Sequence, residues 1–202
     1  MRRRGAVQTL AAGAALLAGG VLPYGLSTIL APGRAVAERN YLRPPGAPLD
    51  DDAFVAACIG CGLCGEVCPP RCIFFHTRDG GGEVNTPYVD AGKRGCTLCG
   101  KCMEVCPTSA LSIVPRNEIN MGLAHIDRTA CYPWVDRGIC GACATICPLG
   151  AKAISFEFAN IYRPVVRKGC VGCGLCVEVC PHPSTPIWID PSARAINTAS
   201  EA

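Results

Sequence analysis

The sequence predicts an α+β fold made of two similar small units, preceded by a segment of different character. Three observations predict it. A cysteine motif recurs four times between residues 58 and 180, short apolar or alternating runs separate the copies, and residues 1–37 are rich in Ala, Leu and Gly. Recurrence of one motif indicates copies of one supersecondary unit, and alternating runs of four to six residues indicate short strands.

The four copies of the motif have nearly the same spacing. In three of them, two residues separate each of the first three cysteines from the next, three residues precede the fourth, and proline follows it. In the third copy, eight residues separate the first two cysteines. The sixteen cysteines are Cys58, Cys61, Cys64, Cys68, Cys96, Cys99, Cys102, Cys106, Cys131, Cys140, Cys143, Cys147, Cys170, Cys173, Cys176 and Cys180. Cys72 lies outside the pattern.

This spacing has a chemical reason. Three thiolates on a turning loop can reach three iron atoms of one cubane, while the fourth cysteine, expected to open a helix, points toward a neighbouring cluster. The motif therefore predicts two ferredoxin-like units whose sixteen cysteines bind the iron of four [4Fe–4S] clusters. Zinc sites use paired cysteines and do not require this spacing, and a disulfide framework does not require it either. Both alternatives are weaker.

The pairing of the copies stays open at this point. In a tandem arrangement, Cys106 completes the first set of three cysteines and Cys68 the second, while Cys180 completes the third set and Cys147 the fourth. In a nested arrangement, the first copy exchanges its last cysteine with the fourth copy, and the second copy with the third. The sixteen ligands are the same in both.

The spacers suggest the division of the chain. Residues 38–57 are expected to form an extended arm and a short helix, because Pro and Gly precede Asp50–Asp52 and an apolar run. Residues 58–122 form the first unit, residues 123–192 the second, and residues 193–202 a tail. The strands are expected at 73–76, 87–89, 110–114, 124–127, 153–158, 163–166 and 186–190, in small hairpins.

The first 37 residues are expected to be a twin-arginine signal peptide. Arg2, Arg3 and Arg4 precede a long uncharged stretch, and Ala35-Val36-Ala37 fits a cleavage site. The protein would then be exported to the periplasm after its cofactors are inserted. The alternative is a retained signal that anchors the chain to the inner membrane.

Charge excludes one class of partner. The formal charge is +3, but four basic residues and no acidic ones lie in residues 1–37, which leaves 15 basic and 16 acidic residues. Four clusters, each with four thiolates and a net charge of −2, would bring the loaded protein to roughly −9. Since no basic patch remains, nucleic-acid binding is not expected.

Segments outside the cysteines support a resemblance. They are Leu42–Ala47, Thr86–Tyr88, Met121–Ala124 and Ile126–Asp127, together with the stretched third motif. With these segments, the chain resembles the NapG/MauM family of ferredoxin-type proteins. The resemblance implies a periplasmic electron carrier with no catalytic residues. Its partners would be a membrane ferredoxin-type quinol-linked protein and a periplasmic oxidoreductase of the nitrate reductase or methylamine dehydrogenase type. The alternative is an assembly or maturation factor for such an oxidoreductase.

Five other residues carry expectations. Cys72 is expected to be a small buried hydrophobe beside the first cluster, with an auxiliary or reactive thiol as the alternative. His76, His125 and His182 are expected to be structural. Trp134 is expected to pack within the insertion of the third motif, and shielding of the cluster there is the alternative.

Overall fold

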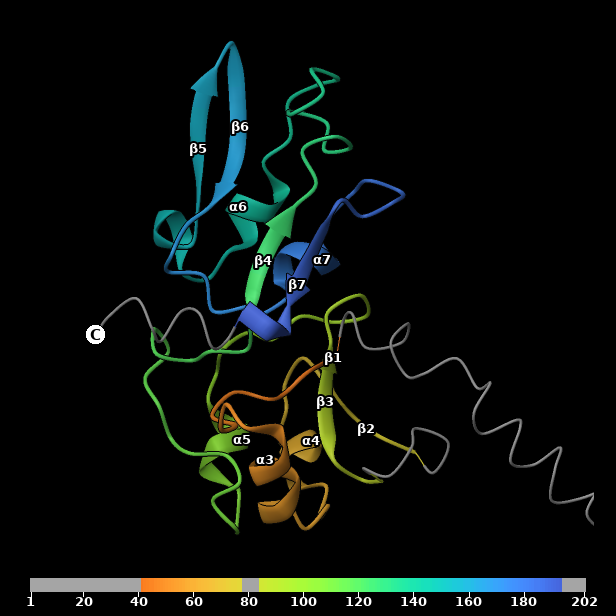
Figure 1. Cartoon of the computed structure of the whole chain (residues 1–202), viewed down its shortest axis with the longest axis vertical. Helices are drawn as coiled ribbons and strands as arrows, with labels where there is room; N and C mark the ends of the chain where they lie inside the picture. Colours follow the sequence, from red (N-terminus) through yellow and green to blue (C-terminus); the bar gives the residue numbers. More distant parts are fainter. Residues whose placement is uncertain (1–40, 78–83, 194–202) are drawn as a thin grey trace, which may run out of the picture. The chain divides into compact units, whose positions relative to one another are not determined.

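A computed structural model of the chain describes residues 41–77 and 84–193, all within one compact unit that spans residues 39–202 (Figure 1). The predicted signal peptide, the start of the arm and all but the first residue of the predicted tail lie outside the described residues. In the described ranges, no helix has the length and apolar character needed to cross a membrane.

The first half of the described chain, residues 41–122, contains a three-stranded antiparallel sheet, and the second half is residues 123–193. Its strands are β1 (Tyr41–Leu42), β2 (Ile73–Phe75) and β3 (Pro87–Asp90), in the order β1-β3-β2. Val89 lies between Leu42 on one side and Ile73 on the other, and all three side chains are buried. The hairpin expected from 73–76 and 87–89 is confirmed. The arm was predicted only as extended, and the structure makes its residues 41 and 42 an edge strand.

Helix α3 (Asp51–Ala57) joins the arm to the first motif, as expected. Asp50 caps it, because its carboxylate accepts the N–H of Asp52. Phe54 is fully buried, and the guanidinium of Arg43 lies 4.9 Å from the centre of its ring. The same guanidinium binds both carboxylate oxygens of Asp51, at 2.6 and 2.8 Å. The arm and the helix therefore form part of the first half's core.

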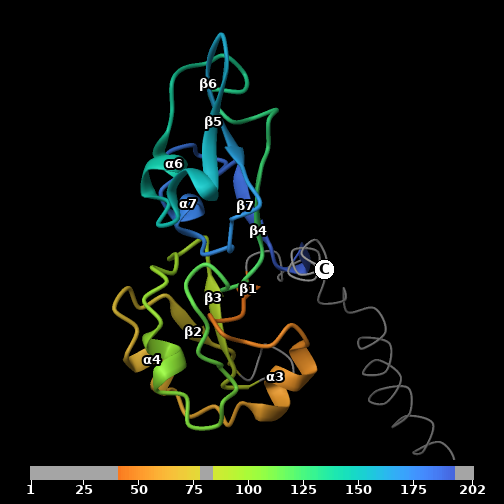
Figure 2. The same cartoon turned by 90° about the vertical axis from the view of Figure 1, so that its left-hand side faces the viewer.

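The remaining elements are short. The first two motifs contribute the helices α4 (Leu63–Glu66) and α5 (Lys101–Glu104). The second half contains β4 (Leu123–Ile126), α6 (Ala142–Ile146), η5 (Gly150–Lys152), β5 (Ile154–Ala159), β6 (Ile161–Val166), α7 (Leu175–Glu178), β7 (Ile187–Asp190) and η6 (Pro191–Ala193). The hairpin of β5 and β6 is confirmed. Strand β4 pairs antiparallel with β7, and about sixty residues separate the two strands in sequence. Figure 2 shows β4 to β7 with α6 and α7 as one group.

The strand predicted at residues 110–114 is wrong. These residues are irregular, and Ala110 and Leu111 are both buried, whereas successive residues of a strand point to opposite faces. The N–H of Ser112 donates to the carbonyl of Gly46 in the arm. Three prolines of that arm, at positions 44, 45 and 48, have no N–H, so the contact does not extend into a ladder.

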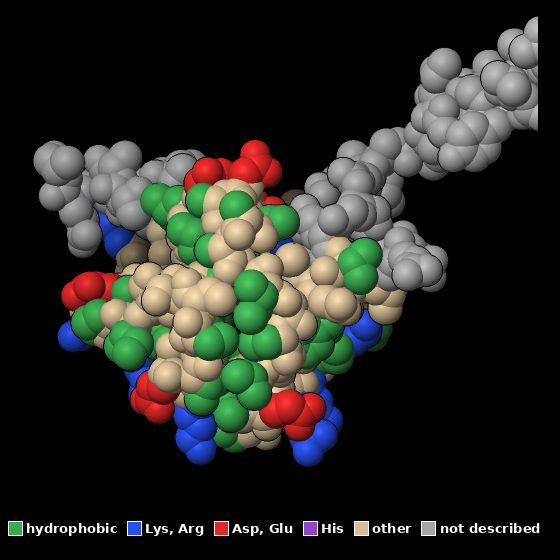
Figure 3. Space-filling model, turned by 90° about the horizontal axis from the view of Figure 1, so that it is seen from below, with side chains coloured by type: hydrophobic (Ala, Val, Ile, Leu, Met, Phe, Trp, Pro, Cys, Tyr) green, Lys and Arg blue, Asp and Glu red, His purple; other side chains and the backbone are tan. Residues whose placement is uncertain are grey.

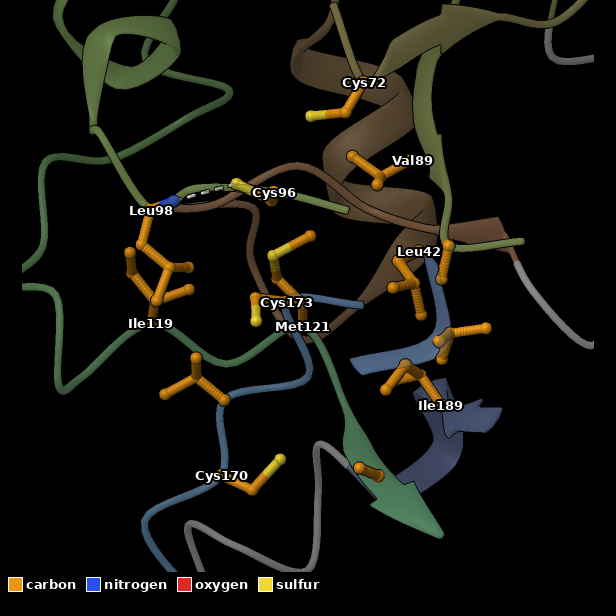
Figure 4. Packing of buried hydrophobic residues seen from close by; sticks show 14 of the residues in the cluster. Leu42, Cys72, Val89, Cys96, Leu98, Ile119, Met121, Cys170, Cys173 and Ile189 are labelled. Atoms are coloured by element: carbon orange, nitrogen blue, oxygen red, sulfur yellow. Dashed lines mark hydrogen bonds between the residues drawn. The ribbon is translucent and has the colours of Figure 1, made fainter. Parts of the chain in front are cut away.

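One apolar core connects the two halves. Its buried side chains include Leu42 and Val89 from the first sheet and Ile189 from β7, which Figure 4 shows together. Six of the motif cysteines, and Cys72, are among the buried residues. The core is therefore built around the cysteine sites.

Candidate metal centres

The three regular motifs adopt one local structure. The glycine directly after the second cysteine precedes a one-turn α-helix. The backbone of this glycine lies in the left-handed region, with a φ of 81° at each of Gly62, Gly100 and Gly174. Other residues are strained there, which explains why glycine occupies this position in all three copies. The one-turn helix carries the third cysteine. The fourth cysteine follows the helix and does not open one, so that detail of the prediction is wrong.

The third motif also carries its third cysteine on a short helix, but the glycine before that helix is not in the left-handed region. Gly141 has a φ of −137°, and the eight-residue segment between Cys131 and Cys140, which contains the insertion, folds back onto strand β6. The indole N–H of Trp134 donates to the carbonyl of Pro164 at 3.0 Å. The guanidinium groups of Arg128 and Arg163 lie 4.2 and 5.4 Å from the centre of the indole ring. Trp134 therefore holds the insertion in place, as expected of a packing residue.

The sixteen cysteines come together in four sets of four. Site 1 is a cavity lined by Cys58, Cys61, Cys64 and Cys106. Site 3 is a cavity lined by Cys131, Cys140, Cys143 and Cys180. Site 4 is a cavity lined by Cys147, Cys170, Cys173 and Cys176. The remaining four cysteines, Cys68, Cys96, Cys99 and Cys102, form site 2. Burial raises the pKa of Cys102, and the charges of Cys96, Cys99, Cys64 and Cys68 raise it further.

These sets are the tandem combination. Each site takes three cysteines from one motif and the fourth from its neighbour, as in two-cluster ferredoxins. The nested arrangement is not the one that the structure contains. The sequence allowed both the tandem and the nested pairing, and the positions of the cysteines in the fold select the tandem one.

The thiols are held where ionisation is costly. Burial raises the pKa of Cys64 and Cys143 to about 11, and that of Cys102 and Cys173 to about 12, and the neighbouring thiolates raise each further. Burial likewise raises the pKa of Cys176. Four thiolates can therefore share a buried site when a cation compensates their charge, as the iron of a cluster does.

Backbone amides point at the sulfur atoms. The N–H of Leu98 donates to the Sγ of Cys96 at 3.4 Å, and the N–H of Gly172 donates to Cys170 at the equivalent position of the fourth motif. Burial alone would raise the pKa of Cys106, but the amides of Leu111, Thr108 and Ala110 together lower it. Amide donors to ligating sulfurs are typical of iron–sulfur sites.

The cavities at sites 1, 3 and 4 have the form that a cluster requires. Among the residues that the structure describes, no three His, Cys, Asp or Glu side chains converge closely enough to hold one metal ion. A [4Fe–4S] core is wider than one ion, so its four thiolates stand around a space and do not meet at a point. Sites 1, 3 and 4 have this form, with a cavity between the thiols.

Cys72 lies at site 2, not beside the first motif's own cysteine triplet. Its side chain is buried, as predicted, and its Sγ lies 3.6 Å from the Sγ of Cys68. It also interacts with the thiol of Cys96, which raises the pKa of Cys72 and lowers that of Cys96. The sequence analysis did not predict this contact. The turn residues that follow Cys68 are the local signal that could have suggested it.

The three histidines have structural contacts. The His76 ring lies 4.4 Å from the ring of Tyr88. His125 stacks on Trp188, and the Nδ1 of His182 accepts the N–H of Ser184 at 3.1 Å. These contacts agree with the structural role that the sequence suggests.

Comparison with known proteins gives the class and then the family. Two family models, each described as a 4Fe-4S dicluster domain, match the chain, one at residues 57–110 and 95–151 and the other at residues 124–181. The matches at 57–110 and 124–181 enclose sites 1 and 2 and sites 3 and 4, respectively. The chain thus contains ferredoxin-type domains of the 4Fe–4S dicluster class.

Curated relatives carry two names. The ferredoxin-type protein NapG of Escherichia coli (strain K12) is 34% identical over 178 residues, which are 81% of this chain and 76% of the relative. The methylamine utilization ferredoxin-type protein MauM of Methylorubrum extorquens is 34% identical over 156 residues, 71% of this chain and 70% of the relative. NapG of Haemophilus influenzae is 33% identical, and the match spans 63% of its length. This chain belongs to the family of NapG and MauM ferredoxin-type proteins, which confirms the resemblance.

Proposed function

We propose that this chain is a periplasmic electron carrier that holds four [4Fe–4S] clusters, one in each of sites 1 to 4. The observation that carries the proposal is that the four sites form a continuous row. The bound clusters would each accept and release one electron. The chain's own residues bind them through thiolates, stabilise their charge through backbone amides and exclude water by burial.

The row runs in the order 1, 2, 4, 3. Sites 1 and 2 adjoin, because helix α4, which carries Cys64, contacts helix α5, which carries Cys102. Sites 2 and 4 adjoin, because the backbone N–H of Cys96 donates to the carbonyl of Cys173 at 2.7 Å. Sites 4 and 3 adjoin, because helix α6, which carries Cys143, contacts helix α7, which carries Cys176. Electrons would enter at one end of this row and leave at the other.

The two ends of the row present apolar side chains to solvent. Ile59 and Leu63 flank Cys61 at site 1, and their exposed fractions are 67% and 46%. Ile139, which is 86% exposed, precedes Cys140 at site 3. Figure 3 shows hydrophobic side chains across the middle of the face below the first half, with many of the charged ones toward its edge. Exposed apolar patches rimmed by charge are typical of protein-binding surfaces.

The partners and the location follow from the family and from the first 37 residues. A membrane ferredoxin-type protein linked to quinol would deliver electrons at one end. A periplasmic oxidoreductase, of the nitrate reductase or methylamine dehydrogenase type, would receive them at the other. The twin-arginine segment would direct the folded chain to the periplasm. The chain would be a carrier and not itself an enzyme.

The test uses the full chain purified without oxygen. It should contain about sixteen iron and sixteen acid-labile sulfide atoms, because each cubane holds four of each. A redox titration should then show four reversible centres that a quinol-linked donor reduces. Loaded clusters that no such donor can reduce would refute the relay and leave the assembly factor. A chain that binds zinc in place of iron would refute the cluster assignment itself.

A further inference from the structure

Cys72 lies between two predicted ligands of site 2. Its thiol is 1% exposed. Its Sγ lies 3.6 Å from that of Cys68, and its pKa is raised most by the interaction with the thiol of Cys96, which belongs to a different copy of the motif. Figure 4 shows Cys72 above Cys96 in the buried core. The contact is therefore made at the junction of two motifs.

A tight turn brings Cys72 to this place. The N–H of Arg71 donates to the carbonyl of Cys68, and Arg71 has a φ of 51°. The second motif makes the equivalent turn, with a φ of 57° at Ser109. Four residues after its last cysteine it has Ala110, which is buried and lines site 1. Sites 1 and 2 thus share one backbone geometry, but only site 2 of this pair has a thiol at that position.

The chemistry of the thiol follows from its neighbours. When Cys68 and Cys96 bind iron, both are thiolates and have no proton to donate. Cys72 has no place in the spacing of the ligands, so it keeps its S–H. The amide of Leu98 donates to the sulfur of Cys96, and the thiol of Cys72 lies within hydrogen-bond distance of the sulfur of Cys68, so site 2 has a second donor. Donors to a ligating sulfur stabilise the more negative, reduced form of a cluster.

We propose that Cys72 is not a ligand but a hydrogen-bond donor to the sulfur of Cys68, and that it raises the reduction potential of the cluster at site 2. This inference depends on the proposed function. The change in potential would affect the middle of the row, because Cys96 of site 2 makes the backbone contact with Cys173 of site 4. The cluster that receives the extra donor is the one through which electrons would cross between the halves.

The test is a redox titration monitored by electron paramagnetic resonance, with iron and sulfide measured on the same samples. Cys72→Ala and Cys72→Val remove the donor, and Val also fills most of the space. We expect full iron content in both. At the potential where the site 2 cluster of the unaltered protein is half reduced, less than half should be reduced in the variants. Cys72→Ser keeps a hydrogen-bond donor, so the reduction potential of the site 2 cluster should not fall in this variant.

Leu98→Ala is the matched control. It removes a buried side chain beside the same cluster but keeps the amide that donates to Cys96. It should not reproduce the downward shift. Unchanged potentials in Cys72→Ala and Cys72→Val with full iron content would overturn this inference and leave the proposed function standing. Loss of one cluster in both would also overturn it, because Cys72 would then be a ligand. An iron-free unaltered chain would overturn both proposals.

Discussion

The backbone N–H of Cys96 donates a 2.7 Å hydrogen bond to the carbonyl oxygen of Cys173. The two residues belong to the second and fourth motifs, and each is a predicted ligand of a different cluster. Two further bonds lie close by, from Gly95 N–H to a carboxylate oxygen of Glu178 at 2.7 Å and from Met121 N–H to the carbonyl of Val171. The halves of the chain therefore meet at the cysteine loops themselves.

This contact requires glycine at position 95. A Cβ there would lie 2.5 Å from the backbone nitrogen of Leu175, which is too close for any real contact. Gly95→Ala should lower the free energy of unfolding by about 1–3 kcal/mol, as overpacking in a core does. The midpoint of heat-induced loss of cluster absorbance measures it. Gly141→Ala is the control, because its Cβ would meet only the end of the Phe156 ring, at 3.0 Å. Equal midpoints for the two variants would contradict the prediction.

The tandem exchange of cysteines predicts a specific pattern of cluster loss. Cys68→Ser should remove about a quarter of the iron, since one of four clusters loses a ligand. Adding Cys99→Ser should remove little more, because both cysteines belong to site 2. Adding Cys61→Ser in place of Cys99→Ser should bring the loss to about half, because Cys61 belongs to site 1. Iron analysis of the three proteins measures it, and the reverse pattern would favour another pairing.

Trp134 should protect the cluster at site 3 indirectly. Trp134→Phe loses the hydrogen bond to the carbonyl of Pro164, which lines that site. The cost is about 1 kcal/mol for one such bond. The iron of one cluster should then be lost faster to a chelator. Trp188→Phe changes a half-exposed indole that stacks on His125 and serves as the control. If both variants lose iron at the rate of the unaltered protein, Trp134 does not hold the insertion.

Arg43 should stabilise the first half through its forked head group. It is 9% exposed, binds both oxygens of Asp51 and donates to the carbonyl of Pro87 at 3.3 Å. Arg43→Lys keeps the charge but loses this geometry, so we expect a loss of about 1–2 kcal/mol. The urea midpoint for loss of cluster absorbance measures it. Arg94→Lys, at an exposed bond to the carbonyl of Pro70, should be nearly neutral.

Much of the local structure could be predicted. Six of the seven expected strands are present, because period-two alternation and glycine-rich turns act over a few residues. The strand at 110–114 failed because its neighbour in space is a proline-rich arm distant in sequence. The contact of Cys72 with Cys96 was missed for a related reason. It depends on a left-handed turn at Arg71 and on a motif twenty-four residues later.

The sequence by itself determined the chemistry of the sites and the number of candidate ligands, because thiol spacing and a glycine after the second cysteine constrain only a short loop. Tertiary structure alone decided three things. It chose the tandem exchange of the last cysteines, paired β4 with β7, and placed the Cys96 loop against the Cys173 loop. Each of these joins segments far apart in the chain. Such contacts depend on which packed arrangement buries the apolar core, and no local pattern records that choice.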